Sequence, residues 1–210
     1  ELLSFKDNAV FRNWDNEHGQ ELWVTDGSRN GTHLLLDIVP GTKSSFASPQ
    51  FELEGSLIFA ANDADGLLQL YKTDGTTQGT SSFFSIEDYP GDYKAAKRDN
   101  TVFFFSARNR ALESKPNFLY ISDGTKDGTK DLGINIYGRA AAVTEIVVAG
   151  GRAIFATEFD NATLWTSDGT EDGTIKIAEF SEINELVVVN NTVYFTALQD
   201  SETEFYRTDG

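Results

Sequence analysis

The chain has 210 residues, of which 33 are acidic and 17 are basic, giving a formal net charge of −16. A field of this sign repels nucleic acid and anionic membranes, so we expect neither nucleic-acid binding nor direct membrane insertion. The chain contains no cysteine, which excludes a disulfide framework, cysteine-ligated zinc and a thiol nucleophile.

One short motif recurs along the whole chain. Its copies read LWVTDGSRNGT (22–32), LYKTDGTTQGT (70–80), LYISDGTKDGT (119–129) and LWTSDGTEDGT (164–174), and FYRTDG (205–210) begins a fifth. The motif aspartates are Asp26, Asp74, Asp123, Asp168 and Asp209, which are separated by 48, 49, 45 and 41 residues. A period of roughly 40 to 50 residues is typical of a solenoid or propeller array.

Each repeat predicts four short strands, with the motif between the third and the fourth. The first strands are expected at 2–8, 50–55, 93–100, 145–151 and 185–191, the copy at 93–100 being the weakest. Each ends in a turn pair rich in Asn, Asp and Gly: Asp7-Asn8, Glu54-Gly55, Asp99-Asn100, Gly150-Gly151 and Asn190-Asn191. Such pairs tolerate the positive φ of two-residue hairpin turns. The second strand should therefore pair antiparallel with the first.

The remaining strands also align between repeats. The second strands carry an aligned phenylalanine at Phe11, Phe59, Phe105, Phe155 and Phe195. The third strands carry an aromatic residue at Trp23, Tyr71, Tyr120, Trp165 and Tyr206. Fourth strands are expected at 33–39, 81–86, 130–136 and 175–180, the third of them irregular. β-branched and aromatic residues bounded by Gly, Asn and Asp indicate strands, and no stretch has a sustained helical period.

The prediction is an all-β fold, a β-propeller of about five blades with four-stranded antiparallel blades. We expect the last blade to lack its outermost strand, because the sequence stops inside the fifth motif, at Asp209-Gly210, one strand before that blade is complete. We expect residues 1–210 to be a single propeller domain or a fragment of a larger one. Its units run approximately over 1–41, 42–91, 92–138, 139–181 and 182–210.

The four complete motifs resemble the ELWxxDGTxxGT repeat of large exported bacterial proteins. The similarity covers essentially the whole chain, with Ser28 in place of a threonine and tyrosine in place of tryptophan in three copies. The resemblance implies an exported, extracellular or cell-surface bacterial protein that carries further repeats or domains. That family is defined by its repeat and not by a reaction, so the resemblance implies no activity.

The motif itself predicts a structural turn. Its aspartate can accept hydrogen bonds from backbone amides two or more residues on. The first glycine (Gly27, Gly75, Gly124 and Gly169) should supply positive φ, and the second (Gly31, Gly79, Gly128 and Gly173) either positive φ or room for a close approach. The alternative is that the aspartates surround a cation or ligand. The structural interpretation is favoured because every repeat has to rebuild the same turn.

Few residues indicate a catalytic or metal-binding site. No catalytic triad is indicated, since His18 and His33 lie outside any such pattern, and no cofactor is expected. A calcium loop is a weak alternative at Asp63 and Asp65, whose close oxygen ligands precede Gly66. The later bidentate glutamate of the twelve-residue calcium loop is missing there.

Function is expected on the loops that differ between repeats, those joining the second strand to the third and the fourth to the next repeat. The candidate ligand-binding residues in or beside these loops are Trp14, Tyr89, Tyr93, Phe159, Arg108 and Arg110. Aromatic side chains there could stack on sugar rings or anchor a protein. The sequence thus predicts a non-enzymatic adhesion, display or interaction module for other proteins or surface glycans. The alternative is a carbohydrate-active propeller, either a lectin or a glycan hydrolase or lyase.

Overall fold

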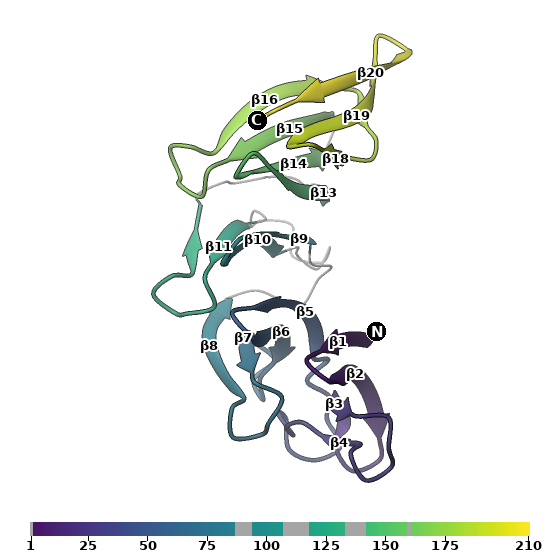
Figure 1. The fold of residues 1–210 in the computed structure, drawn as a ribbon, viewed down its shortest axis with the longest axis vertical. Coiled ribbons are helices and arrows are strands. Elements are labelled where there is room, and N and C mark those ends of the chain that lie inside the picture. Colours follow the sequence, from purple (N-terminus) through teal and green to yellow (C-terminus); the bar gives the residue numbers. More distant parts are fainter. Residues whose placement is uncertain (1, 87–93, 107–117, 133–141, 159–160) are drawn as a thin grey trace. The chain divides into compact units, whose positions relative to one another are not determined.

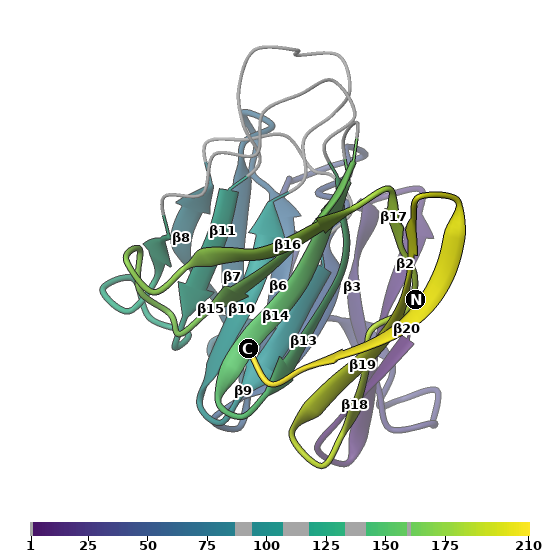
Figure 2. The same ribbon diagram turned by 90° about the horizontal axis from the view of Figure 1, so that it is seen from above.

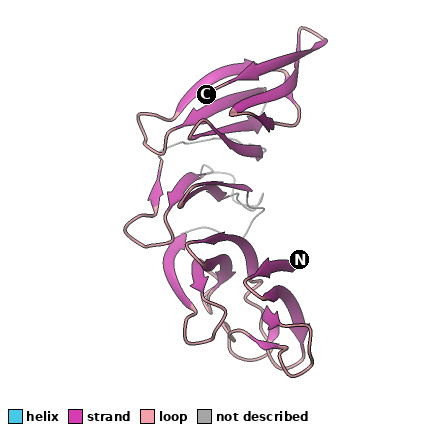
Figure 3. Cartoon of the chain, viewed as in Figure 1, coloured by secondary structure: helices cyan, strands magenta, loops and turns pink. Residues whose placement is uncertain are grey.

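The computed structural model describes residues 2–86, 94–106, 118–132, 142–158 and 161–210. Within these ranges the chain consists of strands, turns and loops, without a helix (Figure 3). The described part accordingly contains no helix that could span a membrane. The all-β prediction is confirmed.

The strands form five antiparallel sheets in two compact units. The first unit comprises residues 1–90 and 124–127, and the second comprises residues 91–123 and 128–210. In the first unit, one sheet holds β1 (Leu2–Phe5), β2 (Asn8–Asp15), β3 (Gly19–Thr25) and β4 (His33–Leu34), and the other holds β5 (Ser48–Leu53), β6 (Ser56–Asn62), β7 (Leu68–Thr73) and β8 (Ser81–Ile86). Each sheet keeps its strands in chain order, as Figure 1 shows.

The second unit contains three sheets. The third sheet holds β9 (Lys94–Arg98), β10 (Thr101–Ser106), β11 (Phe118–Ser122) and β12 (Lys130–Asp131), and the fourth holds β13 (Ala142–Ala149), β14 (Arg152–Glu158), β15 (Ala162–Ser167) and β16 (Ile175–Phe180). The fifth holds β17 (Glu182–Ile183), β18 (Val187–Val189), β19 (Thr192–Gln199) and β20 (Glu202–Thr208). The order β13-β14-β15-β16 can also be followed in Figure 2.

Two-residue turns join the first two strands in the first four sheets, and one joins β18 to β19 in the fifth. Both central residues have positive φ at Gly150-Gly151 and at Asn190-Asn191, as the primed hairpin turns require. In the first sheet Phe5 pairs with Asn8, so the turn is Lys6-Asp7 and not the predicted Asp7-Asn8. Lys6 takes the positive φ there, at 53°. The error arose because Asp and Asn both favour turns, and a one-residue shift leaves both near the turn.

Neighbouring sheets pack face to face in the three interfaces that lie within a unit. Phe5, Val10 and Leu22 of the first sheet pack with Leu57 and Phe59 of the second. The third sheet packs on the fourth through Phe103 and Phe155, and the fourth on the fifth through Ile154 and Phe195. Side chains alternate between the faces of a strand, so the fourth sheet uses one face for the third sheet and the other for the fifth.

In the second, fourth and fifth sheets, a cross-strand aromatic pair lies on the face turned toward the preceding sheet. Phe59 stacks on Tyr71 with ring centroids 5.1 Å apart, Phe155 on Trp165 at 6.2 Å and Phe195 on Tyr206 at 5.5 Å. In the third sheet the residue opposite Tyr120 is Phe104 and not the predicted Phe105. Three consecutive phenylalanines make the alignment ambiguous in the sequence, and only strand pairing resolves it.

Two other strand predictions need correction. In the first sheet, the predicted fourth strand at 33–39 ends at Leu34, because the chain then turns into the long loop before β5. The predicted strand 185–191 is replaced by two short strands on the same edge of β19, since β17 pairs with residues 197–198 and β18 with residues 192–194. Among the described residues β20 pairs only with β19.

Candidate functional site

The candidate site is a group of loops at one end of the sheets in the first unit. These loops join β2 to β3, β4 to β5 and β6 to β7, and we call them the rim loops. Two large aromatic side chains are exposed there, Trp14 at 58% and Phe46 at 54%. Leu67 is a third exposed apolar residue, in the loop between β6 and β7. Solvent-exposed aromatic residues on ordered loops are typical of binding sites.

Trp14 precedes a hydrogen-bonded turn. It lies near the end of β2 opposite Gln20 of β3, and Arg12 lies two residues earlier on the same face. The next residue, Asp15, accepts hydrogen bonds from the backbone amides of Glu17 (2.8 Å) and His18 (2.7 Å). His18 Nδ1 lies 2.9 Å from Asp15 Oδ2. The indole of Trp14, the guanidinium of Arg12 and the amide of Gln20 therefore lie on one face of the β2–β3 hairpin, near its end.

Phe46 lies in the loop before β5, which is attached to β3. The carboxylate of Glu21 is fully buried and accepts hydrogen bonds from the backbone amide (3.1 Å) and the hydroxyl of Ser45. Ser44 Oγ accepts a hydrogen bond from the amide of Gln20 at 2.9 Å. The residues on either side of Phe46 are buried, while Phe46 itself projects to solvent.

Burial has an electrostatic consequence at Glu21. Loss of solvent raises the pKa of its carboxyl group, and the hydrogen bonds from Ser45 partly oppose that rise. Asp37 adds a smaller effect in the same direction as burial. Glu21 thus acts as a buried anchor for the loop.

The backbone of Phe46 is strained. Its φ is +55°, a conformation that bulky residues rarely adopt because the Cβ crowds the backbone. Strained residues of this kind concentrate at ligand contacts and active sites. The fixed position of Phe46 between two buried neighbours makes it a strong candidate contact residue.

The loop between β6 and β7 contains the suggested calcium ligands. Asp63 Oδ1 accepts hydrogen bonds from the amides of Asp65 (3.0 Å) and Leu67 (2.9 Å), and Asp63 Oδ2 accepts one from Gln69 Nε2 (2.9 Å). Both carboxylate oxygens of Asp63 therefore accept hydrogen bonds from within this hairpin, Oδ1 from the loop and Oδ2 from Gln69 of β7. Within the described ranges, the structure contains no group of three or more His, Asp or Glu side chains placed to hold a metal.

The repeated motif forms a closed turn between the third and fourth strands. In the fourth sheet, Asp168 Oδ1 accepts hydrogen bonds from the amide (2.9 Å) and hydroxyl (2.7 Å) of Thr170. The hydroxyls of Ser167 and Thr174 lie 2.7 Å apart across the turn. The second sheet has the same bonds at Asp74 and Thr76, and the first has the amide bond from Ser28 to Asp26.

The two motif glycines have different roles. The first has positive φ in all four complete copies, as the sequence predicts, with values from +82° at Gly124 to +98° at Gly75. The second is needed for close approach. A Cβ at Gly173 would lie 2.0 Å from Asp168 Oδ1, and equivalent collisions occur at Gly31 and Gly79. The carboxylate therefore lies directly against the glycine.

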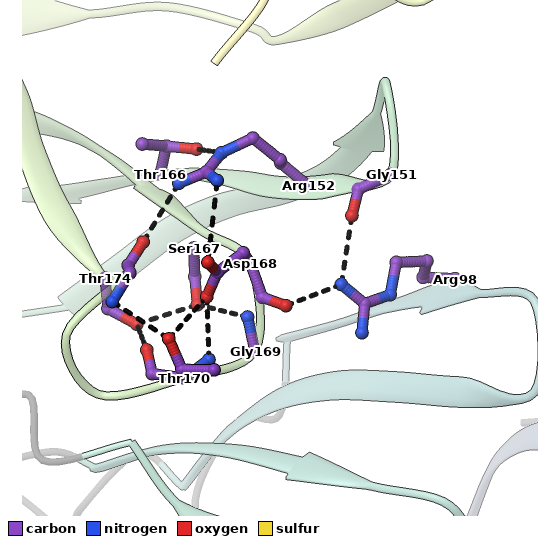
Figure 4. Close-up of polar contacts among 10 residues, drawn as sticks. Arg98, Gly151, Arg152, Thr166, Ser167, Asp168, Gly169, Thr170 and Thr174 are labelled. Carbon is purple, nitrogen blue, oxygen red and sulfur yellow. Dashed lines mark hydrogen bonds and ion pairs between the residues drawn. The ribbon is translucent and has the colours of Figure 1, made fainter.

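The motif turn also contacts the neighbouring sheet. Figure 4 shows Arg98 of β9 donating hydrogen bonds from Nη1 to the carbonyls of Asp168 (2.8 Å) and Gly151 (3.0 Å). Its guanidinium also lies 5.0 Å from the ring centroid of Phe103. Lys6 makes the corresponding contact in the first unit, donating from Nζ to the carbonyl of Asp74 at 2.8 Å. The motif therefore joins adjacent sheets as well as adjacent strands.

The structure describes only one of the predicted ligand-binding residues, Trp14. The remaining five, Tyr89, Tyr93, Phe159, Arg108 and Arg110, lie outside the described residues. Sequence reasoning missed Phe46, Glu21 and Ser45. An aromatic residue inside a loop rich in Gly, Pro and Ser was the available signal for Phe46, whereas the contact of Glu21 with Ser45 spans 24 residues.

Comparison with known proteins identifies the fold class. No protein-family model matches the chain, and no curated protein sequence matches it. Among solved structures, the β-propeller domain of the Trilobed protease from Pyrococcus furiosus superposes with a TM-score of 0.54 at 15% identity, over 100% of this chain and 68% of that one. BamB from Moraxella catarrhalis superposes with a TM-score of 0.51 at 14% identity, over 93% of this chain and 53% of that one.

Enzymes are also among the similar structures. An oligogalacturonate lyase in complex with manganese superposes with a TM-score of 0.53 at 9% identity, over 91% of this chain and 56% of the lyase. The chain spans only about half the length of BamB and of this lyase. At such low identity the likeness shows a propeller-like fold, and it is not evidence for or against an activity.

Proposed function

We propose that this chain is a non-enzymatic propeller module of an exported or cell-surface bacterial protein, and that it binds glycans or proteins through its rim loops. The observation that carries the proposal is the pair of exposed aromatic residues, Trp14 and Phe46, each fixed by its own hydrogen-bonded loop. The five sheets correspond to about five blades, with the motif turn as the repeated structural element. The repeat resemblance supports the proposed location.

The geometry favours a sugar ring as ligand. A planar indole offers an apolar surface to the C–H face of a sugar. Arg12 and Gln20, on the same face of β2 and β3 as Trp14, can hydrogen-bond to hydroxyl or carboxylate groups. Several repeats in a longer parent chain would add weak contacts into useful avidity.

A glycan array with the purified chain tests this proposal. Trp14→Ala and Phe46→Ala should each weaken binding by about tenfold or more, since central aromatic contacts dominate such interfaces. Ile175→Ala is a matched control, because Ile175 is similarly exposed but lies on β16. Unchanged binding in both rim variants would contradict the proposal.

The alternative is a carbohydrate-active propeller, because the same aromatic surface would suit a polysaccharide substrate. Propellers carry both binding and catalytic functions, so the fold does not decide between them. Incubating the chain with the polysaccharides that it binds, with and without manganese or calcium, separates the two. Release of reducing ends or unsaturated products would establish the enzymatic alternative.

A further inference from the structure

Asn30 and Gly31 form the one Asn-Gly pair in the sequence. They lie in the first copy of the motif turn, between β3 and β4, and Asn30 is exposed to solvent. Glycine has no Cβ and adopts many backbone conformations, so the Gly31 nitrogen can approach the side-chain carbonyl carbon of Asn30. This approach is the first step of asparagine deamidation.

The other copies of the motif show what the turn accepts in place of Asn30. Their residues before the second glycine are Gln78, Asp127 and Asp172. In the fourth sheet, the glycine after Asp172 donates its amide hydrogen to Thr170 Oγ1 at 2.9 Å. Gly31 donates to Ser28 Oγ at 3.0 Å in the same way. The same turn therefore forms with an acid at this position, and an aspartate in place of Asn30 should fit it.

The exposure of Asn30 does not depend on whether another repeat precedes the first sheet. The second and fourth sheets each pack on a preceding sheet of their own unit. Gln78 and Asp172 hold the position of Asn30 in those two sheets, and both are exposed. The preceding sheet contacts other positions of the turn, as where Thr77 Oγ1 donates to the carbonyl of Leu35 at 2.8 Å. A sheet packed before the first one in the same way would leave Asn30 open to water.

We propose that Asn30 is a site of spontaneous deamidation, which converts the first copy of the motif turn from an amide form to an acidic form. The Gly31 nitrogen forms a bond to Cγ of Asn30, and the bond from Cγ to Nδ2 breaks. The side-chain nitrogen takes up the proton lost from the Gly31 amide and leaves as ammonia, so that a cyclic succinimide remains. Water then opens this ring at either carbonyl group and gives aspartate or isoaspartate.

The hydrogen bonds of the turn affect both the rate and the product. The bond from the Gly31 amide to Ser28 Oγ must break before the nitrogen attacks, so the folded turn slows the reaction. Isoaspartate lengthens the backbone of a turn that is closed by Thr32 Oγ1, which donates to the carbonyl of Ser28 at 2.7 Å. The isoaspartate product should therefore loosen the turn, whereas the aspartate product should not.

The corresponding residues of the other copies should not react in this way. Asp127 and Asp172 are already acids, so they have no amide to lose and gain no charge. Gln78 has a longer side chain, and the larger ring that it would form closes more slowly. Among the four complete copies, only the first should gain charge with time.

Peptide mapping by mass spectrometry tests the proposal on the folded chain, stored in mildly alkaline and in mildly acidic buffer. Asn30 should be converted before any other asparagine of the sequence, and faster in the alkaline buffer, because the attacking nitrogen must lose its proton. Isoelectric focusing should show a species that is one charge unit more negative. Ser28→Ala removes the hydrogen bond that restrains the Gly31 amide, so this variant should react faster.

Two control variants use residues that other copies carry at this position. Asn30→Gln should keep its charge under the same conditions, and Asn30→Asp should unfold at the temperature of the fresh wild-type chain. Glycan binding through the rim loops should not change with storage, because the motif turn lies at the opposite end of β3 from those loops.

Three outcomes would overturn the proposal. Asn30 could remain an amide while other asparagines are converted. All asparagines could react at one rate, which would remove any special role of this turn. Conversion could occur only in chain unfolded by urea, which would assign the reaction to the unfolded chain and not to the folded turn.

Discussion

At the scale of single residues, the second motif glycine is a sterically constrained position. Gly173→Ala would place a Cβ against the Asp168 carboxylate, so the turn must open or the carboxylate must leave. We expect the free energy of unfolding to fall by about 1–3 kcal/mol, the usual cost of forcing an atom into a packed site. Urea denaturation measures this loss.

The double variant Asp168→Ala/Gly173→Ala separates the collision from a general effect of alanine. Once the carboxylate is removed, the added methyl group has space, so the two substitutions should be less than additive. Additive losses would show that the glycine is needed for some other reason. Gly41→Ala tests the effect of positive φ alone, because a Cβ there meets no atom within 4 Å.

Glu21 gives a prediction about pH. Its pKa in the folded chain is raised by burial above the ordinary value of 4.5. Its contribution to stability is therefore fully present below about pH 4.5 and is lost as the pH rises through the raised pKa. The glutamine of Glu21→Gln does not titrate. The melting temperature of this variant, relative to that of the wild type, should therefore increase between about pH 4 and about pH 8.

Ser45→Ala is the informative control for this measurement. It removes a hydrogen bond to Glu21 but leaves the buried carboxyl group, so it should be less stable and keep the pH dependence. A stability difference between Glu21→Gln and the wild type that does not change with pH would contradict the assignment. Asp15, Asp26, Asp74 and Asp168 have lowered pKa values from local hydrogen bonds, so their contribution is lost only as the solution becomes strongly acidic.

At the scale of strands and turns, Arg98 connects one sheet to the motif turn of the next. Arg98→Ala removes two hydrogen bonds to backbone carbonyls. It should lower the free energy of unfolding by about 1 kcal/mol, a modest value because the contact is partly exposed to water. Lys97→Ala removes the same charge from an exposed position of β9 and should change stability by much less. Equal effects in chemical denaturation would show that only the charge matters.

Features set by neighbouring residues were predicted well from the sequence. The turn pairs, the strand order and the positive φ of the first motif glycine depend on side chains a few positions apart. The errors occurred where more than one local solution exists, as at Lys6-Asp7 and Phe104. The loop carrying Phe46 could not be predicted, because its shape depends on Glu21 meeting Ser45 across 24 residues. Sequence patterns report local preference, and such a contact depends on tertiary packing.

At the scale of the whole molecule, excess negative charge should oppose folding. The chain carries a net charge of −16, and its self-repulsion is greater in the compact state than in the unfolded one. Salt shortens the Debye length from about 30 Å at 0.01 M to about 10 Å at 0.1 M, so repulsion between distant carboxylates weakens first. The melting temperature should therefore rise between about 0.02 M and about 0.5 M sodium chloride, with most of the rise at low salt.

The competing effect of salt is small in this chain. Salt also weakens attractive pairs such as Arg152–Asp168 and Lys176–Glu179, but exposed pairs of this kind contribute little to stability. Calorimetry at low protein concentration measures the folding of the single chain apart from association. Potassium chloride should act like sodium chloride, because screening depends on ionic strength and not on the identity of the cation. A melting temperature that falls with salt would mean that attractive pairs outweigh the net repulsion.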